Sequence, residues 1–270
     1  MSRSLKQIQK LLATEARRNP EQNPKVSVNQ RIQDHLDQAS TLEGTSVPNS
    51  FVSFTKVDKL GINPGSTFNT PLGIYSYPSF YVMELVGLND SMSNLPFAGA
   101  TSEFANVFSA KGNVIDLSNV SSKELNTLKD NIKKMYLRYA GVRKNSPEAM
   151  EHTEFLEDEV FDAAPSNARI KTKGGQFWWI TMEVASVMIE HPEIGSKMFD
   201  SWTPTKMPVS WNKVFREVGI DGCIDTQGDG IIHPEERVQA VFFSKQAIAE
   251  SSRYFNRHSP ADRGKGIGGR

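Results

Sequence analysis

Residues 225–236 combine acidic and amide side chains with a glycine at a spacing that can bind a hard cation. Asp225, Gln227 and Asp229 alternate along the chain, Gly230 follows, and Glu236 stands at the twelfth position counted from Asp225. A calcium ion gathers about six to eight oxygen ligands, the glycine permits the sharp turn, and the glutamate at position twelve supplies two of the oxygens. This spacing is that of an EF-hand loop, and it predicts a calcium site.

The segments on either side of this loop favour a different structure. An EF-hand loop is entered and left by helices, yet Gly219 and Gly222 shortly precede it, and both oppose helix formation. After the loop, residues 238–243 form an apolar run rich in β-branched and aromatic residues, which favours a buried strand. The backbone of this run therefore distinguishes a calcium site from a site built on a sheet.

The elements that would position such a site divide into a β-rich first half and a helical block. Strands are predicted at 51–57, 73–77, 104–110 and 113–117, with a turn at 63–67 and a hairpin or bulge at Lys111-Gly112. Helices are predicted after the capping box that begins at Ser121, from Pro147, at 176–190 and around Trp211. A tight entry at 219–224 leads into a further short strand.

The composition excludes several classes of protein. Lys plus Arg and Asp plus Glu number 31 each among 270 residues, so we expect no strong general affinity for nucleic acid. A single cysteine, Cys223, cannot form a disulfide within the chain. Neither a signal peptide nor a membrane span is predicted, which favours the cytoplasm of a cell or of a phage-infected host. Residues 1–46 are expected to form a helical arm, and residues 253–270 a disordered tail.

Taken in chain order, five segments resemble the ADP-ribosyltransferase fold shared by bacterial toxins, poly(ADP-ribose) polymerases and many phage proteins. They are residues 51–57, 73–77, 104–117, 219–224 and 239–248. Together they also resemble proteins of tailed phages and mobile elements. The resemblance implies an α+β fold over residues 47–252, with a split, twisted β core that binds NAD between two sheets and a helical insertion at about 121–200.

The resemblance also implies roles for individual residues. Tyr75 or Tyr77 would stack on the nicotinamide, because an aromatic face offers contact area at little entropic cost. Thr55 falls near the position that binds the ribose. Gln239 stands at the position of the catalytic glutamate, and Gln239 and Glu236 would orient or activate the acceptor.

Two departures from the family pattern leave alternatives open. Residues 51–57 contain neither Arg nor His, so Lys56 or Lys59 would have to contact the phosphates without the planar fork of arginine. Gln239 carries no charge to stabilise a developing cation.

Other groups would then have to replace that charge, or the chemistry is absent. Glu235 or Glu236, helped by His233 as a proton-transfer group, would substitute for the glutamate. Three functions therefore remain. The chain transfers ADP-ribose from NAD to a protein or nucleic acid, or it is a catalytically inactive phage structural or binding protein with a macromolecular partner, or it binds calcium at 225–236.

Overall fold

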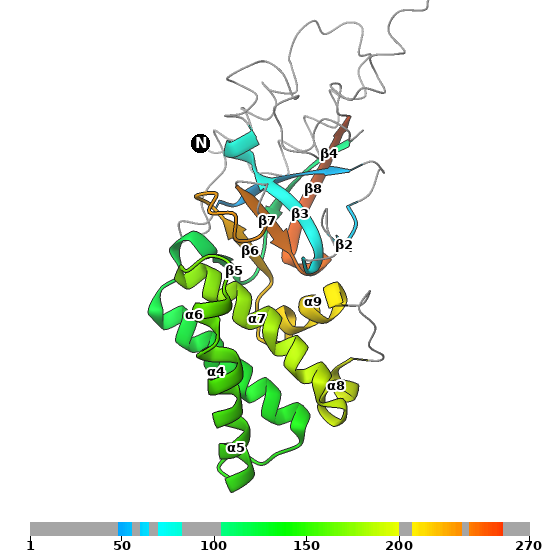
Figure 1. The fold of residues 1–270 in the computed structure, drawn as a ribbon. Coiled ribbons are helices and arrows are strands. Elements are labelled where there is room, and N and C mark those ends of the chain that lie inside the picture. Colours follow the sequence, from blue (N-terminus) through cyan, green and yellow to red (C-terminus); the bar gives the residue numbers. More distant parts are fainter. Residues whose placement is uncertain are drawn as a thin grey trace, which may run out of the picture. The chain divides into compact units, whose positions relative to one another are not determined.

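The computed structural model describes residues 48–55, 60–64, 70–82, 104–199, 207–233 and 238–255, which form an α+β protein (Figure 1). The chain divides into two compact units. Unit 1 holds the described residues within 1–60, 77–109 and 249–270, and unit 2 those within 61–76 and 110–248. The predicted domain at 47–252 thus contains residues of both units, and the predicted arm at 1–46 lies outside the described residues.

Unit 1 is built on a sheet of aromatic-rich strands. β1 (Ser50–Thr55) pairs antiparallel with β4 (Phe104–Ala110) along its whole length, and its other edge pairs with the end of β3 (Leu72–Pro78). β8 (Ile248–Phe255) lies next to β4. Phe51 stacks on Phe108 with 5.9 Å between ring centroids. Because β8 continues to Phe255, the tail predicted from residue 253 begins inside a strand.

The sheet of unit 2 has the strand order β5 (Val114–Asp116), β6 (Gly222–Asp225), β7 (Gln239–Phe242) and β3, with β2 (Asn63–Pro64) also paired to β3. β5 and β6 are parallel, and β7 runs antiparallel to both of its neighbours. All four residues of β7 are buried. The strand predicted within 238–243 is therefore confirmed.

The predicted hairpin between β4 and β5 is wrong. β4 pairs with β1, whereas β5 pairs with β6, which follows it by more than a hundred residues. The chain turns between the two strands at Gly112, whose φ is +87°. The carboxylate of Asp221 holds this turn by accepting a hydrogen bond from the Asn113 amide at 2.8 Å. The turn predicted at 63–67 begins instead as β2, and its residues 65–67 lie outside the described residues.

The helices that the structure describes in unit 2 are α4 (Ser122–Ala140), α5 (Pro147–Leu156) with a π-helical continuation (Glu157–Phe161), α6 (Ala164–Asn167), α7 (Lys173–Glu190), α8 (Pro192–Met198) and α9 (Met207–Glu217). Of these helices, α4, α5 and α7 begin at residues whose side chains cap them, Ser121, Ser146 and Thr172. Short 3-10 helices follow β5 (η2, Leu117–Asn119) and β7 (η5, Lys245–Ala247). The capping box of Ser121 and Glu124 is present, and proline occupies the first turn of α5 as predicted. These local predictions are confirmed.

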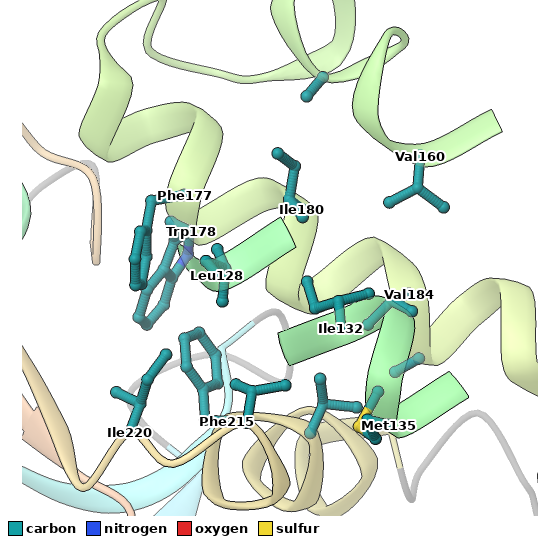
Figure 2. Packing of buried hydrophobic residues seen from close by; sticks show 14 of the residues in the cluster. Leu128, Ile132, Met135, Val160, Phe177, Trp178, Ile180, Val184, Phe215 and Ile220 are labelled. Atoms are coloured by element: carbon teal, nitrogen blue, oxygen red, sulfur yellow. The ribbon is translucent and has the colours of Figure 1, made fainter. Parts of the chain in front are cut away.

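α7 lies at the centre of the hydrophobic core of unit 2 (Figure 2). Its Phe177, Trp178, Ile180 and Val184 are buried with residues of α4 and α9. Phe215 of α9 stacks on Phe243 with 4.2 Å between ring centroids, and this contact joins the helices to the end of β7. No helix of the described ranges has both the length and the apolar character needed to cross a bilayer.

Asn212 fastens α9 to the sheet with a single amide group. Its Nδ2 donates to the carbonyl of Leu72 at 2.5 Å and to that of Phe243 at 2.7 Å. These carbonyls lie at the start of β3 and just after β7, so one side chain satisfies backbone acceptors of two strands. The position of α9 on the sheet therefore depends on a polar contact as well as on apolar packing.

Replacement of Gly174 by alanine tests the close approach of α7 to η2. An added Cβ would lie 1.8 Å from the carbonyl oxygen of Leu117. Although alanine has the higher helix propensity, this backbone overlap should lower the free energy of unfolding by about 3 kcal/mol. Gly61→Ala is the matched control, since a Cβ there meets nothing within 4 Å. Urea unfolding measures both variants, and equal stabilities would contradict the packing.

Replacement of Tyr136 by phenylalanine tests the alkaline behaviour of the core. The Tyr136 hydroxyl is buried without a hydrogen-bond partner among the described residues, and burial together with the charge of Glu193 raises its pKa to about 12. The unfolded tyrosine loses its proton from about pH 10, so wild-type stability should fall between about pH 10 and pH 12. Tyr136→Phe should be as stable as wild type near neutrality and increasingly more stable across that window. If the urea midpoints of wild type and Tyr136→Phe differ by a constant amount up to pH 12, the raised pKa of Tyr136 is contradicted.

Candidate functional site

Two buried aspartates end the parallel strands of unit 2. Asp116 is the last residue of β5, and Asp225 is the last residue of the adjacent β6. The two strands are parallel, so their carboxyl ends lie at the same edge of the sheet. In open α/β sheets this is the edge at which ligands bind. This edge of the sheet is therefore the candidate site among the described residues.

The carboxylate of Asp225 organises the loop that follows β6. Oδ1 accepts hydrogen bonds from the Ser118 hydroxyl and the Asp229 amide, both at 2.9 Å, and Oδ2 accepts one from the Ile231 amide at 2.9 Å. The loop turns at Gly228 and Gly230, which both have positive φ angles. A carboxylate offers about four lone-pair positions. Three of those of Asp225 already accept hydrogen bonds from protein donors.

Asp116 forms the second half of the same network. Its carboxylate accepts from the Thr226 hydroxyl at 2.8 Å, from Asn119 Nδ2 at 2.7 Å and from the Ser118 amide at 3.1 Å. Ser118 connects the two aspartates, because its hydroxyl donates to Asp225 and accepts from the Gln227 amide at 3.0 Å. η2 and the loop after β6 are thus tied together. Sequence reasoning missed Asp116 and Ser118, although an aspartate that ends an apolar strand was the available signal.

The EF-hand spacing is explained by this network. The first-position residue, Asp225, accepts hydrogen bonds from backbone amides of its own loop, and Asp229 contributes its amide while its side chain is exposed. β7 occupies residues through which an exiting helix would continue, and Glu236 lies outside the described residues. Within the described ranges, no group of three or more His, Cys, Asp or Glu side chains could hold a metal ion.

Gln239 lies directly beside the aspartate network. It is the first residue of β7 and the cross-strand partner of Asp225, so the two side chains project from the same face of the sheet. Its side chain is 6% exposed, and its Oε1 has no hydrogen-bond partner among the described residues. His233 is also buried, at the end of the loop after β6. Glu235 lies outside the described residues, as Glu236 does.

Tyr75 is engaged in the interior of unit 2. Its hydroxyl donates to the Pro71 carbonyl at 2.5 Å, and its ring packs against the hydrophobic core. Burial raises the pKa of this hydroxyl well above its ordinary value. The ring therefore contributes to the packing of the unit 2 core.

Tyr77 and Thr55 belong to unit 1. Tyr77 is 4% exposed, and its ring lies 6.1 Å from that of Phe54 and 6.5 Å from that of Tyr81. Thr55 Oγ1 accepts a hydrogen bond from Asn106 Nδ2 at 2.9 Å. Both residues contribute to the structure of their own unit. Lys56 and Lys59, the candidates for phosphate contact, lie outside the described residues.

Among the predicted site residues, the structure places Tyr75 and Gln239 in unit 2, Thr55 and Tyr77 in unit 1, and leaves Glu236 undescribed. The chain shows no significant similarity to models of protein families, to curated proteins or to solved structures. The geometry around Gln239 and Asp225 is therefore the feature from which a function can be inferred.

Paired substitutions at Asp225 and Asp229 separate a hydrogen-bonded loop from a calcium loop. Asp225→Asn places an NH₂ group or a neutral oxygen against three protein donors, and should lower the free energy of unfolding by about 3 kcal/mol. Asp229→Asn, at an exposed side chain, should change it by less than about 0.5 kcal/mol. Urea unfolding with calcium and with EDTA should give the same midpoints. If calcium raises the urea midpoint of wild type but of neither variant, the result would instead support the EF-hand hypothesis.

Proposed function

We propose that this chain is an ADP-ribosyltransferase-like protein that binds NAD beside β7, with Gln239 as its main polar contact. The observation that carries the proposal is the buried Gln239 Oε1, an acceptor with no hydrogen-bond partner among the described residues. A buried acceptor left unpaired lowers stability by about 1–3 kcal/mol, and a ligand or an ordered water that donates to it removes this penalty. Gln239 also stands where the resemblance locates the catalytic glutamate.

The extended backbone of β7 supports the same proposal. The resemblance requires a strand at this point of the chain, and the calcium hypothesis requires a helix. The structure has a strand, paired on both edges. The other segments on which the resemblance rests also contain strands, namely β1, β3, β4, β5 and β6.

The proposed reaction breaks the bond between nicotinamide and ribose and transfers ADP-ribose to a protein or nucleic acid. Gln239 orients a hydroxyl by hydrogen bonding, and Glu236 is the second candidate for acceptor activation. The amide has no charge to stabilise a developing cation, so turnover is slow relative to an enzyme with a carboxylate there. Stacking by Tyr75 or Tyr77 and ribose contact by Thr55 are not needed for this proposal.

A second candidate is a catalytically inactive binding or structural protein on the same scaffold, of the kind found in phages, with a macromolecular partner. The engagement of Tyr75, Tyr77 and Asp225 in packing and hydrogen bonds favours it. On this alternative the polar groups at the edge of the sheet maintain the fold.

NAD binding by purified wild type, Gln239→Ala and Gln227→Ala distinguishes the two candidates. Gln239→Ala should weaken binding about tenfold in titration calorimetry, which corresponds to one hydrogen bond. Gln227→Ala should bind like wild type, because Gln227 is exposed and only its backbone is used. Nicotinamide release, followed by chromatography, reports turnover. A wild type that neither binds nor cleaves NAD would remove the enzyme proposal and leave the binding protein.

A further inference from the structure

The pairing of four strands defines one face of the sheet of unit 2. Side chains of paired residues lie on the same face, and the register places Ile115 of β5, Cys223 and Asp225 of β6, Gln239 and Val241 of β7, and Tyr75 of β3 together. Ile115, Cys223, Val241 and Tyr75 pack against the helical core. The pair of Asp225 and Gln239 thus forms the polar end of a face that helices cover.

Asp225 carries the negative charge of this face. Among the residues of β5, β6, β7 and the unit 2 part of β3, the charged side chains are Asp116 and Asp225. Asp116 pairs with Ile224 and so projects from the opposite face. Cys223 and Tyr75 share the face of Asp225, but burial raises the pKa of both groups, and they stay uncharged near neutral pH.

The surroundings of Asp225 suit a carboxylate and no second charge. The three hydrogen bonds that its carboxylate makes with described residues all come from protein donors, which is the pattern that an ionised acid satisfies. Opposite residues of an antiparallel pair have Cβ atoms about 4.5–5.5 Å apart. A glutamate at 239 would place two carboxylates side by side in a buried site, where like charges oppose ionisation. Glutamine has nearly the same shape and no charge.

We propose that Asp225, and not a residue of β7, supplies the negative charge of the site, and that its carboxylate is the reason why position 239 carries an amide. Asp225 then acts as a positioning residue, because it holds the loop after β6 and sets the electrostatic field at Gln239. The inference rests on the proposed function for its ligand, a molecule with a positively charged ring such as the nicotinamide of NAD. The coupling between the two positions is measurable without any ligand.

The test is a double-mutant cycle of Gln239→Glu and Asp225→Asn, followed by urea unfolding. Each single variant should unfold at a lower urea concentration than wild type. The double variant should lose less free energy of unfolding than the two single variants lose together. Gln239→Met, which adds no charge, should show no such coupling to Asp225→Asn. Gln227→Glu adds the same charge at an exposed position of the neighbouring loop and should unfold like wild type.

The stability of Gln239→Glu as a function of pH provides a second test, which applies even if another variant folds poorly. Burial and the neighbouring Asp225 would raise the pKa of the introduced carboxyl, so its deficit relative to wild type should appear above about pH 4.3, the ordinary glutamate value, and disappear below it. A deficit that is independent of pH, or equally large in the Asp225→Asn background, would overturn the charge assignment. Among the described residues of this loop and of the aspartate network, Asp116, Asp229 and His233 also carry ionisable side chains, and wild type controls for them.

Calorimetry with NAD separates this inference from the proposed function. Asp225→Asn should weaken NAD binding, and the double variant should regain affinity because it restores one negative charge at the same edge. A double variant that recovers stability but no NAD affinity would overturn the role of the charge in binding. A wild type without NAD binding would overturn the proposed function and this role together, whereas coupling in the urea cycle would still establish why position 239 is an amide.

Discussion

The pairing of β7 on both of its edges is the constraint on which unit 2 depends. A buried strand must satisfy its backbone amides and carbonyls, and β7 does so by pairing with β6 on one side and β3 on the other. This pairing sets which side chains face the helices, and it places Gln239 opposite Asp225. Phe243, immediately after the strand, then receives both the ring of Phe215 and a hydrogen bond from Asn212. If residues 239–242 formed a helix, β3 and β6 would lose the strand with which both of them pair.

Elements whose signals are local were predictable from the sequence. The capping box at Ser121, the proline that begins α5 and the apolar run of β7 act within a few residues, and each produced the expected element. Pairing between distant strands was not predictable in this way. Residues 111–112 look like a hairpin turn, yet β5 joins β6 in parallel, with Val114 opposite Gly222. The carboxylate of Asp221 holds the turn from across the fold, and no local pattern encodes that contact.

The candidate site shows the same division. The strand that carries Gln239 followed from the sequence, because the apolar run indicated it. Alternation along β3 gives the face of Tyr75, but it does not reveal what packs on that face, and the core occupies it. The spacing of Asp225, Asp229 and Gly230 is ambiguous for a physical reason. A tight loop around a carboxylate suits backbone amide donors as well as a cation, and only the following segment decides between them.

The distribution of charge in this region limits the chemistry that it can support. Asp225 accepts hydrogen bonds from three donors of its own loop and of η2, and it is the charged side chain of the described strands on this face, because Asp116 projects from the opposite face. Gln239 adds a neutral acceptor without requiring more donors. A fixed negative charge beside an amide can orient hydroxyls and attract a cationic ring, but it supplies no acidic proton for a leaving group. Under the proposed function, a positively charged ring that departs as a neutral molecule needs no acidic proton, whereas a reaction that depends on general acid catalysis would require a donor from elsewhere.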